Sequence, residues 1–110
     1  MMRILVLCSR NQWRSPTAEE VFRGRPGLSV RSAGTSPKAR RRVNQGDIDW
    51  ADIIVVMETK HRDILRKRFG RPLPVHIEVL HIPDEYQFMD PELVGLLEDG
   101  ISALIPAEDS

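Results

Sequence analysis

Residues 4–16 read Ile-Leu-Val-Leu-Cys-Ser-Arg-Asn-Gln-Trp-Arg-Ser-Pro, and this segment carries the clearest indication of the architecture. Its first four residues form a continuous apolar run, which is typical of a strand buried on both faces of a parallel sheet. A polar loop follows, from Cys8 to Arg14. Ser15 and Pro16 then match a helix N-cap and a proline at the first helical position, with apolar residues after them at helical spacing. The segment predicts a buried strand, a loop and a helix in direct succession.

The remainder of the chain alternates in the same way, with breaks at Gly and Pro. The further predicted strands are residues 28–32, 53–57 and 75–80, and the further predicted helices are residues 59–69 and 91–104, with one helical turn at residues 47–51. Residues 33–46 show no apolar period and are expected to form a loop. This alternation predicts an α/β fold: a doubly wound four-stranded parallel sheet with helices on both faces. Ligands of such a sheet bind beyond the carboxyl ends of its strands.

Length and composition are those of an ordinary globular protein, and residues 1–110 are expected to form a single domain. Hydrophobic residues make up 41% and charged residues 29% of the chain, which excludes disordered and fibrous classes. The longest central apolar run, residues 53–57, is far shorter than the roughly 20 residues that cross a bilayer. Cys8 is the only cysteine, so the chain alone forms no disulfide and no cysteine-based metal site. We therefore expect a cytoplasmic monomer that does not associate with membranes.

Charge is distributed unevenly, although the net charge is zero. All 16 Lys and Arg residues lie at or before Arg71 together with seven acidic residues, and the other nine acidic residues follow. This polarity indicates an anion site in the first part of the chain, with nucleic acid as the alternative ligand. The basic runs at residues 38–42 and 66–68 are better explained as solvated faces. Two tryptophans, Trp13 and Trp50, are too few for a base-stacking platform, which disfavours nucleic acid.

Cys8 and Arg14 stand six positions apart in a loop that leads from a strand into a helix N-terminus. Backbone N–H groups of such a loop, together with the helix dipole, can hold a phosphate-sized dianion. The same field favours the thiolate of Cys8, which is the nucleophilic form. Arg14 offers a planar fork of donors that grips two phosphoryl oxygens. The expected phosphate-binding residues are Ser9, Arg10, Asn11, Gln12, Trp13, Arg14 and Ser15.

We call residues 8–15 the cysteine loop. The pattern of cysteine, five residues, arginine and Ser-Pro resembles the signature of the low-molecular-weight protein tyrosine phosphatases, in particular a short bacterial branch of predicted tyrosine phosphatases. The resemblance extends to Thr17-Ala18-Glu19, Val21-Phe22, Ser32-Ala33-Gly34, Lys38-Ala39-Arg40 and Val56-Met57-Glu58. It implies a flavodoxin-like fold with Cys8 as nucleophile and Arg14 as phosphate clamp. It also implies supporting roles for three residues: Asn11 shapes the loop, Ser15 donates to the Cys8 sulfur, and Ser32 assists them.

The family also needs a general acid, on a loop after the last strand. Asp84 lies where that loop is expected, although glutamate replaces the proline that usually follows. Asp90 precedes a proline, but a helix N-cap explains it, so Asp84 is preferred as the acid. The loop between the second and third strands is shorter than in familiar members, which leaves one pocket wall incomplete. Trp13 and Tyr86 are the expected aromatic walls.

The sequence thus predicts a phosphomonoester hydrolase, specifically a protein tyrosine phosphatase, that forms a cysteinyl-phosphate. Its expected substrate is a phosphorylated protein or a small aryl phosphate. It is expected to use no cofactor and no metal, because His61, His76 and His81 lack the spacing of metal ligands. Two alternatives stay open: a noncatalytic phosphate-binding module on the same fold, and an arsenate reductase that uses an external thiol.

Overall fold

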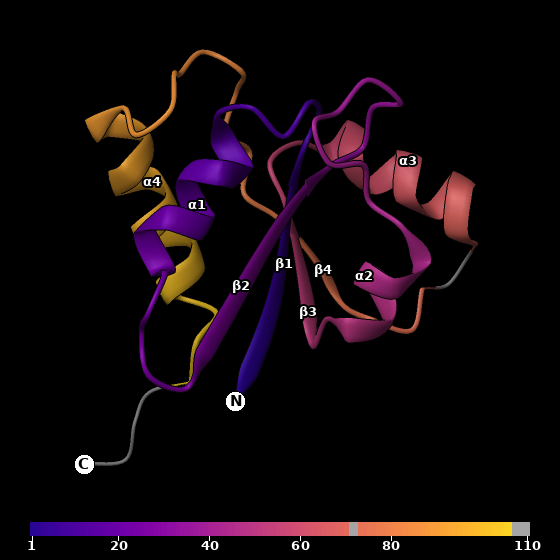
Figure 1. The fold of residues 1–110 in the computed structure, drawn as a ribbon, viewed down its shortest axis with the longest axis horizontal. Coiled ribbons are helices and arrows are strands. Elements are labelled where there is room, and N and C mark those ends of the chain that lie inside the picture. The colour runs from indigo at the N-terminus through magenta and orange to yellow at the C-terminus, as the bar shows by residue number, and fades with distance from the viewer. Residues whose placement is uncertain (71–72, 107–110) are drawn as a thin grey trace.

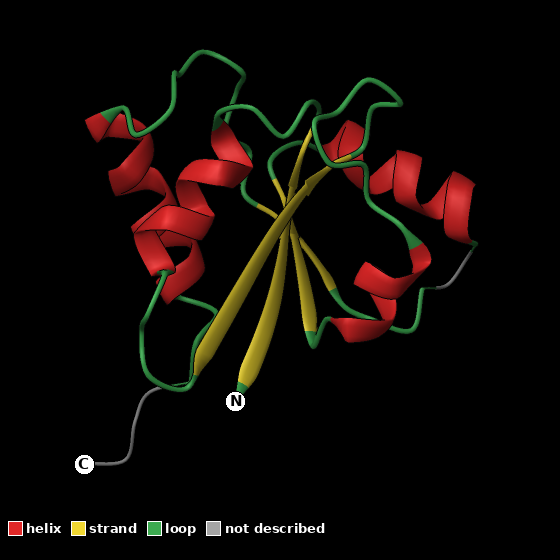
Figure 2. Ribbon diagram, viewed as in Figure 1, coloured by secondary structure: helices red, strands yellow, loops and turns green. Residues whose placement is uncertain are grey.

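The computed structural model describes residues 1–70 and 73–106, and within them a parallel sheet lies between two layers of helices (Figures 1 and 2). In chain order the elements are β1 (Met2–Cys8), α1 (Arg14–Phe22), β2 (Leu28–Gly34), α2 (Gln45–Trp50), β3 (Ile53–Val56), α3 (Thr59–Phe69), β4 (Ile77–Val79) and α4 (Pro91–Ser102). The strand order is β2-β1-β3-β4, and each pairing is parallel. The predicted doubly wound four-stranded sheet is confirmed.

Successive residues of β1 face opposite sides of the sheet, and both sides are covered. Ile4 and Val6 belong to a core shared with α1 and α4, whereas Leu5 and Leu7 belong to a second core shared with α2 and α3. Figure 1 shows these two helix pairs on opposite sides of the strands. All four side chains are fully buried, which explains why the sequence of β1 is continuously apolar rather than alternating.

Several element boundaries differ from the sequence-based prediction. Strand β2 continues to Gly34, two residues beyond the predicted end, because Gly34 pairs with Cys8 in the sheet. Helix α2 starts at Gln45 because the Asn44 side chain caps it, accepting a hydrogen bond from the Asp47 backbone at 2.9 Å. Strand β4 keeps three residues of the predicted six, and α4 ends at Ser102.

The connection from β2 to β3 contains one short helix, α2, which confirms the predicted shortened crossover. Strand β1 and the cysteine loop lead directly into α1, so the loop lies beyond the carboxyl ends of the strands, as predicted for a ligand site. Among the described residues, no helix combines the length and the apolar character that crossing a membrane requires.

Candidate active site

A small cavity of about 30 Å³ opens at the cysteine loop. It is lined by Cys8, Ser9, Arg10, Gln12, Trp13, Arg14 and Asp84. At about 10–15 Å³ for each water-sized group, the cavity holds two or three oxygen-sized groups, as a phosphoryl group presents them. The residues predicted as nucleophile, clamp and acid therefore come together at one cavity, although the acid lies 70 residues or more after the other two in the chain.

The sulfur of Cys8 is buried and meets a chain of hydrogen-bonded side chains. The hydroxyl oxygen of Ser15 lies 3.0 Å from the sulfur. Asn11, held at a positive φ of 57°, donates its two amide hydrogens to the hydroxyls of Ser15 and Ser32, each at 3.0 Å. Ser32 in turn donates to Glu19 at 2.8 Å. Because Asn11 supplies donors to both hydroxyl oxygens, the hydroxyl proton of Ser15 is available to the sulfur.

This arrangement corrects one prediction from the sequence. Ser15 is not the N-cap of α1: the helix starts at Arg14, its N-cap residue is Trp13, and no side chain caps it. The hydroxyl of Ser15 is directed to Cys8 and, at 3.3 Å, to the carbonyl of Ala33 instead.

Arg14 is buried, with a relative exposure of 2%, and one nitrogen of its guanidinium is held by two acceptors. Nη1 donates to a carboxylate oxygen of Glu58 and to the carbonyl of Ile82, the latter at 2.8 Å. Burial would raise the pKa of Glu58, but the hydrogen bond and positive charge of Arg14 outweigh it and hold that pKa below its ordinary value. The resulting ion pair fixes the orientation of the guanidinium beside the cavity.

His61 supports the cysteine loop from α3. Its Nδ1 accepts the backbone N–H of Glu58 at 3.0 Å, so the ring proton lies on Nε2, which donates to the Ser9 hydroxyl at 2.8 Å. Burial and, after it, the nearby charge of Arg14 lower the pKa of His61 to about 4, although Glu58 raises it in part. The ring is therefore neutral at pH 7. Because Ser9 accepts from the ring, its own hydroxyl proton is free to point into the cavity that Ser9 lines.

The two candidate acids occupy different positions. Asp84 lines the cavity, its Oδ1 lies 3.7 Å from Nε of Arg14, and its side chain is 55% exposed. Asp90 is the N-cap of α4 and accepts the Glu92 backbone N–H at 2.9 Å, as the helix-cap interpretation predicts. Tyr86, predicted as a wall, is not among the residues that line this cavity, and its hydroxyl donates to Glu92 at 3.2 Å. Trp13 is a lining residue and is 41% exposed.

The segment after β2 is fastened to the cysteine loop by backbone hydrogen bonds. The N–H groups of Thr35, Ser36 and Arg40 donate to the carbonyls of Cys8, Ser9 and Arg10, at 2.9, 2.9 and 3.1 Å respectively. Gly34 permits this approach: a Cβ at Gly34 would lie 2.5 Å from the Ala39 Cβ and 2.6 Å from the Ser9 carbonyl oxygen. Residues 35–40, predicted only as a loop, therefore support the backbone of the cysteine loop, although none of them lines the cavity.

Three supporting residues were not assigned a role from the sequence: Glu19, Glu58 and His61. Glu19 and Glu58 fall within the motifs that carry the family resemblance. The motifs therefore marked these two residues but gave no role for either. His61 was considered only as a histidine that lacks the spacing of metal ligands, and it is fully buried. Among the described residues, no group of three or more His, Cys, Asp and Glu side chains is placed to hold a metal ion.

Comparison with known proteins gives the fold a name. No family model and no curated protein matches the chain. Solved structures do match. The low molecular weight protein tyrosine phosphatase SP-PTP from Streptococcus pyogenes is 18% identical, with a TM-score of 0.78 over 96% of this chain and 95% of that one. The tyrosine phosphatase Wzb from Escherichia coli K30 is 23% identical, with a TM-score of 0.74 over 94% and 96%.

The arginine phosphatase YwlE from Geobacillus stearothermophilus is 22% identical to this chain, with a TM-score of 0.73 over 94% of this chain and 93% of that one. Coverage above nine-tenths in both directions means that the match spans nearly the whole of each chain. The resemblance drawn from the cysteine loop therefore holds at the level of three-dimensional structure. This chain has the fold of the low-molecular-weight protein tyrosine phosphatases.

Proposed function

We propose that this protein is a phosphomonoester hydrolase of the low-molecular-weight tyrosine phosphatase type, which acts through a cysteinyl-phosphate on Cys8. The observation that carries the proposal is the single cavity lined by the Cys8 sulfur, the buried Arg14 and the accessible Asp84. These three side chains are a nucleophile, a charge clamp and a proton donor, which together are the requirements of phosphoryl transfer to a thiolate.

In the first step the Cys8 thiolate attacks phosphorus, and the bond from phosphorus to the leaving oxygen breaks. Its electron pair goes to that oxygen, which takes a proton from Asp84. In the second step water attacks the cysteinyl-phosphate and gives a proton to the Asp84 carboxylate, while the S–P electron pair returns to Cys8. The Ser15 hydroxyl, 3.0 Å from the sulfur, stabilises the departing thiolate. Arg14 and the loop amides balance the charge of the phosphoryl oxygens in both steps.

The proposed substrate is a phosphorylated protein or a small aryl phosphate, with phosphotyrosine as the expected residue. Trp13 at the cavity supports an aromatic leaving group, because it offers an exposed ring beside the phosphate position. One of the matched structures is an arginine phosphatase. Phosphoarginine is therefore the second substrate class to compare on the same cavity.

The test is hydrolysis of 4-nitrophenyl phosphate and of a phosphotyrosine peptide in the presence of a chelator. The native protein is compared with Cys8→Ser, with Arg14→Lys and with the control Lys67→Gln, which changes an exposed residue of α3. We expect turnover in the native protein and the control, none in Cys8→Ser, and a loss of at least about 100-fold in Arg14→Lys, because a point charge cannot replace the two-pronged grip. Vanadate should inhibit as a mimic of the five-coordinate transition state.

Two outcomes would replace the proposal. Phosphate binding without hydrolysis in the native protein would indicate a noncatalytic phosphate-binding module. Arsenate reduction that depends on an added thiol, without phosphatase activity, would indicate a reductase, because Cys8 has no second cysteine in the chain with which to form a disulfide.

A further inference from the structure

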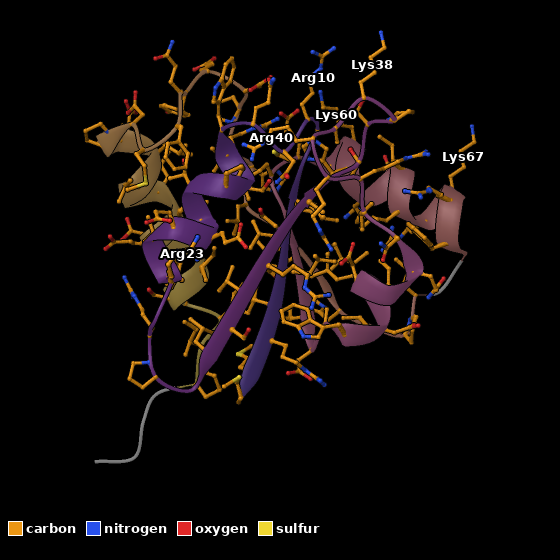
Figure 3. All side chains as sticks on the ribbon, in the orientation of Figure 1. Arg10, Arg23, Lys38, Arg40, Lys60 and Lys67 are labelled. Atoms are coloured by element: carbon orange, nitrogen blue, oxygen red, sulfur yellow. The ribbon has the colours of Figure 1, made fainter. Side chains whose placement is uncertain are left out.

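Four exposed cations stand around one side of the candidate active site: Arg10, Lys38, Arg40 and Lys60. We call them the basic rim. In Figure 3 their side chains gather beyond the carboxyl ends of the strands, whereas Arg23 and Lys67 lie at the flanks of the molecule. Arg10 is itself a lining residue of the cavity. The rim therefore belongs to the surface that a substrate of this cavity would meet.

The other three rim residues lie in segments that are hydrogen-bonded to the cysteine loop. The backbone N–H of Arg40 donates to the carbonyl of Arg10 at 3.1 Å. Lys38 lies in the same segment, whose Ser36 N–H donates to the Ser9 carbonyl at 2.9 Å. Lys60 precedes His61, whose ring donates to the Ser9 hydroxyl at 2.8 Å. The basic rim is thus attached to the loop that carries the nucleophile and is not a set of unrelated surface charges.

Most of this positive charge is not neutralised inside the molecule. Within residues 1–70 and 73–106, Arg10, Lys38 and Arg40 form no salt bridge. Lys60 lies 3.6 Å from Glu58, whose other carboxylate oxygen already binds Arg14. A phosphate in the cavity would use Arg14 and the loop amides, which leaves Lys38 and Arg40 in particular free for further negative charge on the substrate.

The other side of the cavity has the opposite charge. Asp84 lines it, and Glu85 follows as an exposed residue. Figure 1 shows the segment after β4 on the side of α1 and α4, and the segment after β2 on the side of α2 and α3. A ligand that crosses the cavity therefore passes from a basic surface to an acidic one.

We propose that the protein selects phosphorylated peptides or proteins with acidic residues on one flank of the phosphorylated residue, the flank that lies on the basic rim. This inference rests on the proposed function and specifies its substrate class. A peptide can carry acidic residues on a single flank of the phosphorylated residue. It therefore matches a surface that is basic on one side of the cavity and acidic on the other. A nucleic acid strand carries phosphates on both flanks and would press one of them against Asp84 and Glu85, which disfavours it.

The experiment uses phosphotyrosine peptides of equal length with two acidic residues before the phosphotyrosine, two after it, or none. Their kcat/KM values are measured with the native protein, with the double variant Lys38→Glu/Arg40→Glu, and with the matched control Arg23→Glu/Lys67→Glu. An exposed charge pair changes affinity by roughly two- to fivefold. We therefore expect the kcat/KM of one acidic peptide to exceed that of the neutral peptide by about fivefold or more. This ratio should approach one in the rim variant and in high salt, and persist in the control.

Equal kcat/KM values for the three peptides, or equal losses of the ratio in the two double variants, would overturn the inference. So would a single-stranded DNA oligonucleotide that binds through the same rim more tightly than the acidic peptide, which would assign the rim to nucleic acid. The peptide affinities of the Cys8→Ser protein, measured by fluorescence anisotropy, test the same ratio without turnover. If the proposed phosphatase activity is wrong, the native protein does not hydrolyse 4-nitrophenyl phosphate. If the proposed role of the basic rim is wrong, the peptide affinities show no preference for acidic flanks, so the two failures are distinguished.

Discussion

The hydroxyl oxygen of Ser15 lies 3.0 Å from the sulfur of Cys8. The same oxygen accepts a hydrogen bond from Asn11 at 3.0 Å, so its own proton can be donated to the sulfur. The competing acceptor, the carbonyl of Ala33, is farther away at 3.3 Å. An O–H donor fixed against a thiolate contributes most when that thiolate is the leaving group, which is the second step of the proposed reaction.

Replacing Ser15 with alanine should therefore slow hydrolysis of the cysteinyl-phosphate more than its formation. A hydrogen bond to a charged group is worth about 1.5–3 kcal/mol, so kcat should fall roughly 10- to 100-fold, with a burst of the leaving phenol in the first turnover. Rapid-mixing kinetics with 4-nitrophenyl phosphate measure both quantities. Ser102→Ala, an exposed change at the end of α4, is the control. An unchanged kcat without a burst in Ser15→Ala would contradict the assigned role.

Variants of the two candidate acids should differ in how strongly their kcat depends on the leaving group. Asp84→Asn should lower turnover by roughly 100-fold or more on poor leaving groups and less on good ones, because a general acid contributes about 10²–10⁴-fold. Asp90→Asn should leave this dependence unchanged, since Asp90 caps α4. The measurement is kcat against leaving-group pKa for a series of aryl phosphates. A steeper dependence in Asp90→Asn but not in Asp84→Asn would reverse the assignment.

His61 should make the fold sensitive to mild acid. Its folded-state pKa of about 4 is below its ordinary value of 6.5, so between these pH values the unfolded chain binds a proton that the folded chain does not. The free energy of unfolding should therefore fall as pH falls through this window, by at most about 1.4 kcal/mol per pH unit from this residue. Urea denaturation at several pH values measures it.

The variant His61→Gln should remove most of that acid dependence, because glutamine keeps an N–H donor but does not titrate. His76→Gln is the matched control, because His76 is exposed and bonded only to Glu78 among the described residues. Identical pH profiles for the native protein and His61→Gln would mean that another group causes the acid sensitivity.

Gly34 should tolerate no side chain. A Cβ there would lie 2.5 Å from the Cβ of Ala39 and 3.1 Å from the carbonyl carbon of Arg10, so Gly34→Ala must push the cysteine loop and residues 35–40 apart. We expect a loss of about 1–3 kcal/mol in stability together with reduced activity. Gly95→Ala is the control: it lies within α4 with no atom near its added Cβ, and should stabilise by about 0.5–1 kcal/mol. Thermal unfolding of both variants measures these changes. Equal shifts in Tm for Gly34→Ala and Gly95→Ala would show that Gly34 is not needed for the close approach of the two segments.

The parts of the fold that the sequence predicted are those encoded locally. The four apolar residues of β1 are followed at once by the polar loop, so the succession of strand, loop and helix could be read without knowing what packs on them. The exact start of the helix could not, because Pro16 is the third residue of α1 and not the first, as predicted. The same holds for Asp90 and Pro91 at the start of α4. The extension of β2 to Gly34 could not be read in this way, because it depends on pairing with Cys8 across the sheet.

The parts of the site that the sequence did not predict depend on residues far apart in the chain. The bonds from Arg14 to Glu58 and from Ser9 to His61 span 44 and 52 residues. Both depend on how the start of α3 docks against the cysteine loop, which no local pattern encodes. Tyr86 was expected at the cavity, but Glu92, six residues later at the start of α4, accepts its hydroxyl hydrogen bond.

In the proposed reaction the phosphoryl group is transferred to the sulfur of Cys8. The most direct measurement is mass spectrometry of the Cys8-containing peptide after brief reaction with a phosphotyrosine peptide and an acid quench. A phosphoryl group should be found on Cys8 in the native protein and in greater amount in Ser15→Ala, whereas Cys8→Ser should show no turnover. Turnover by the native protein without any phosphoryl group on Cys8, or sustained turnover by Cys8→Ser, would show that Cys8 is not the nucleophile.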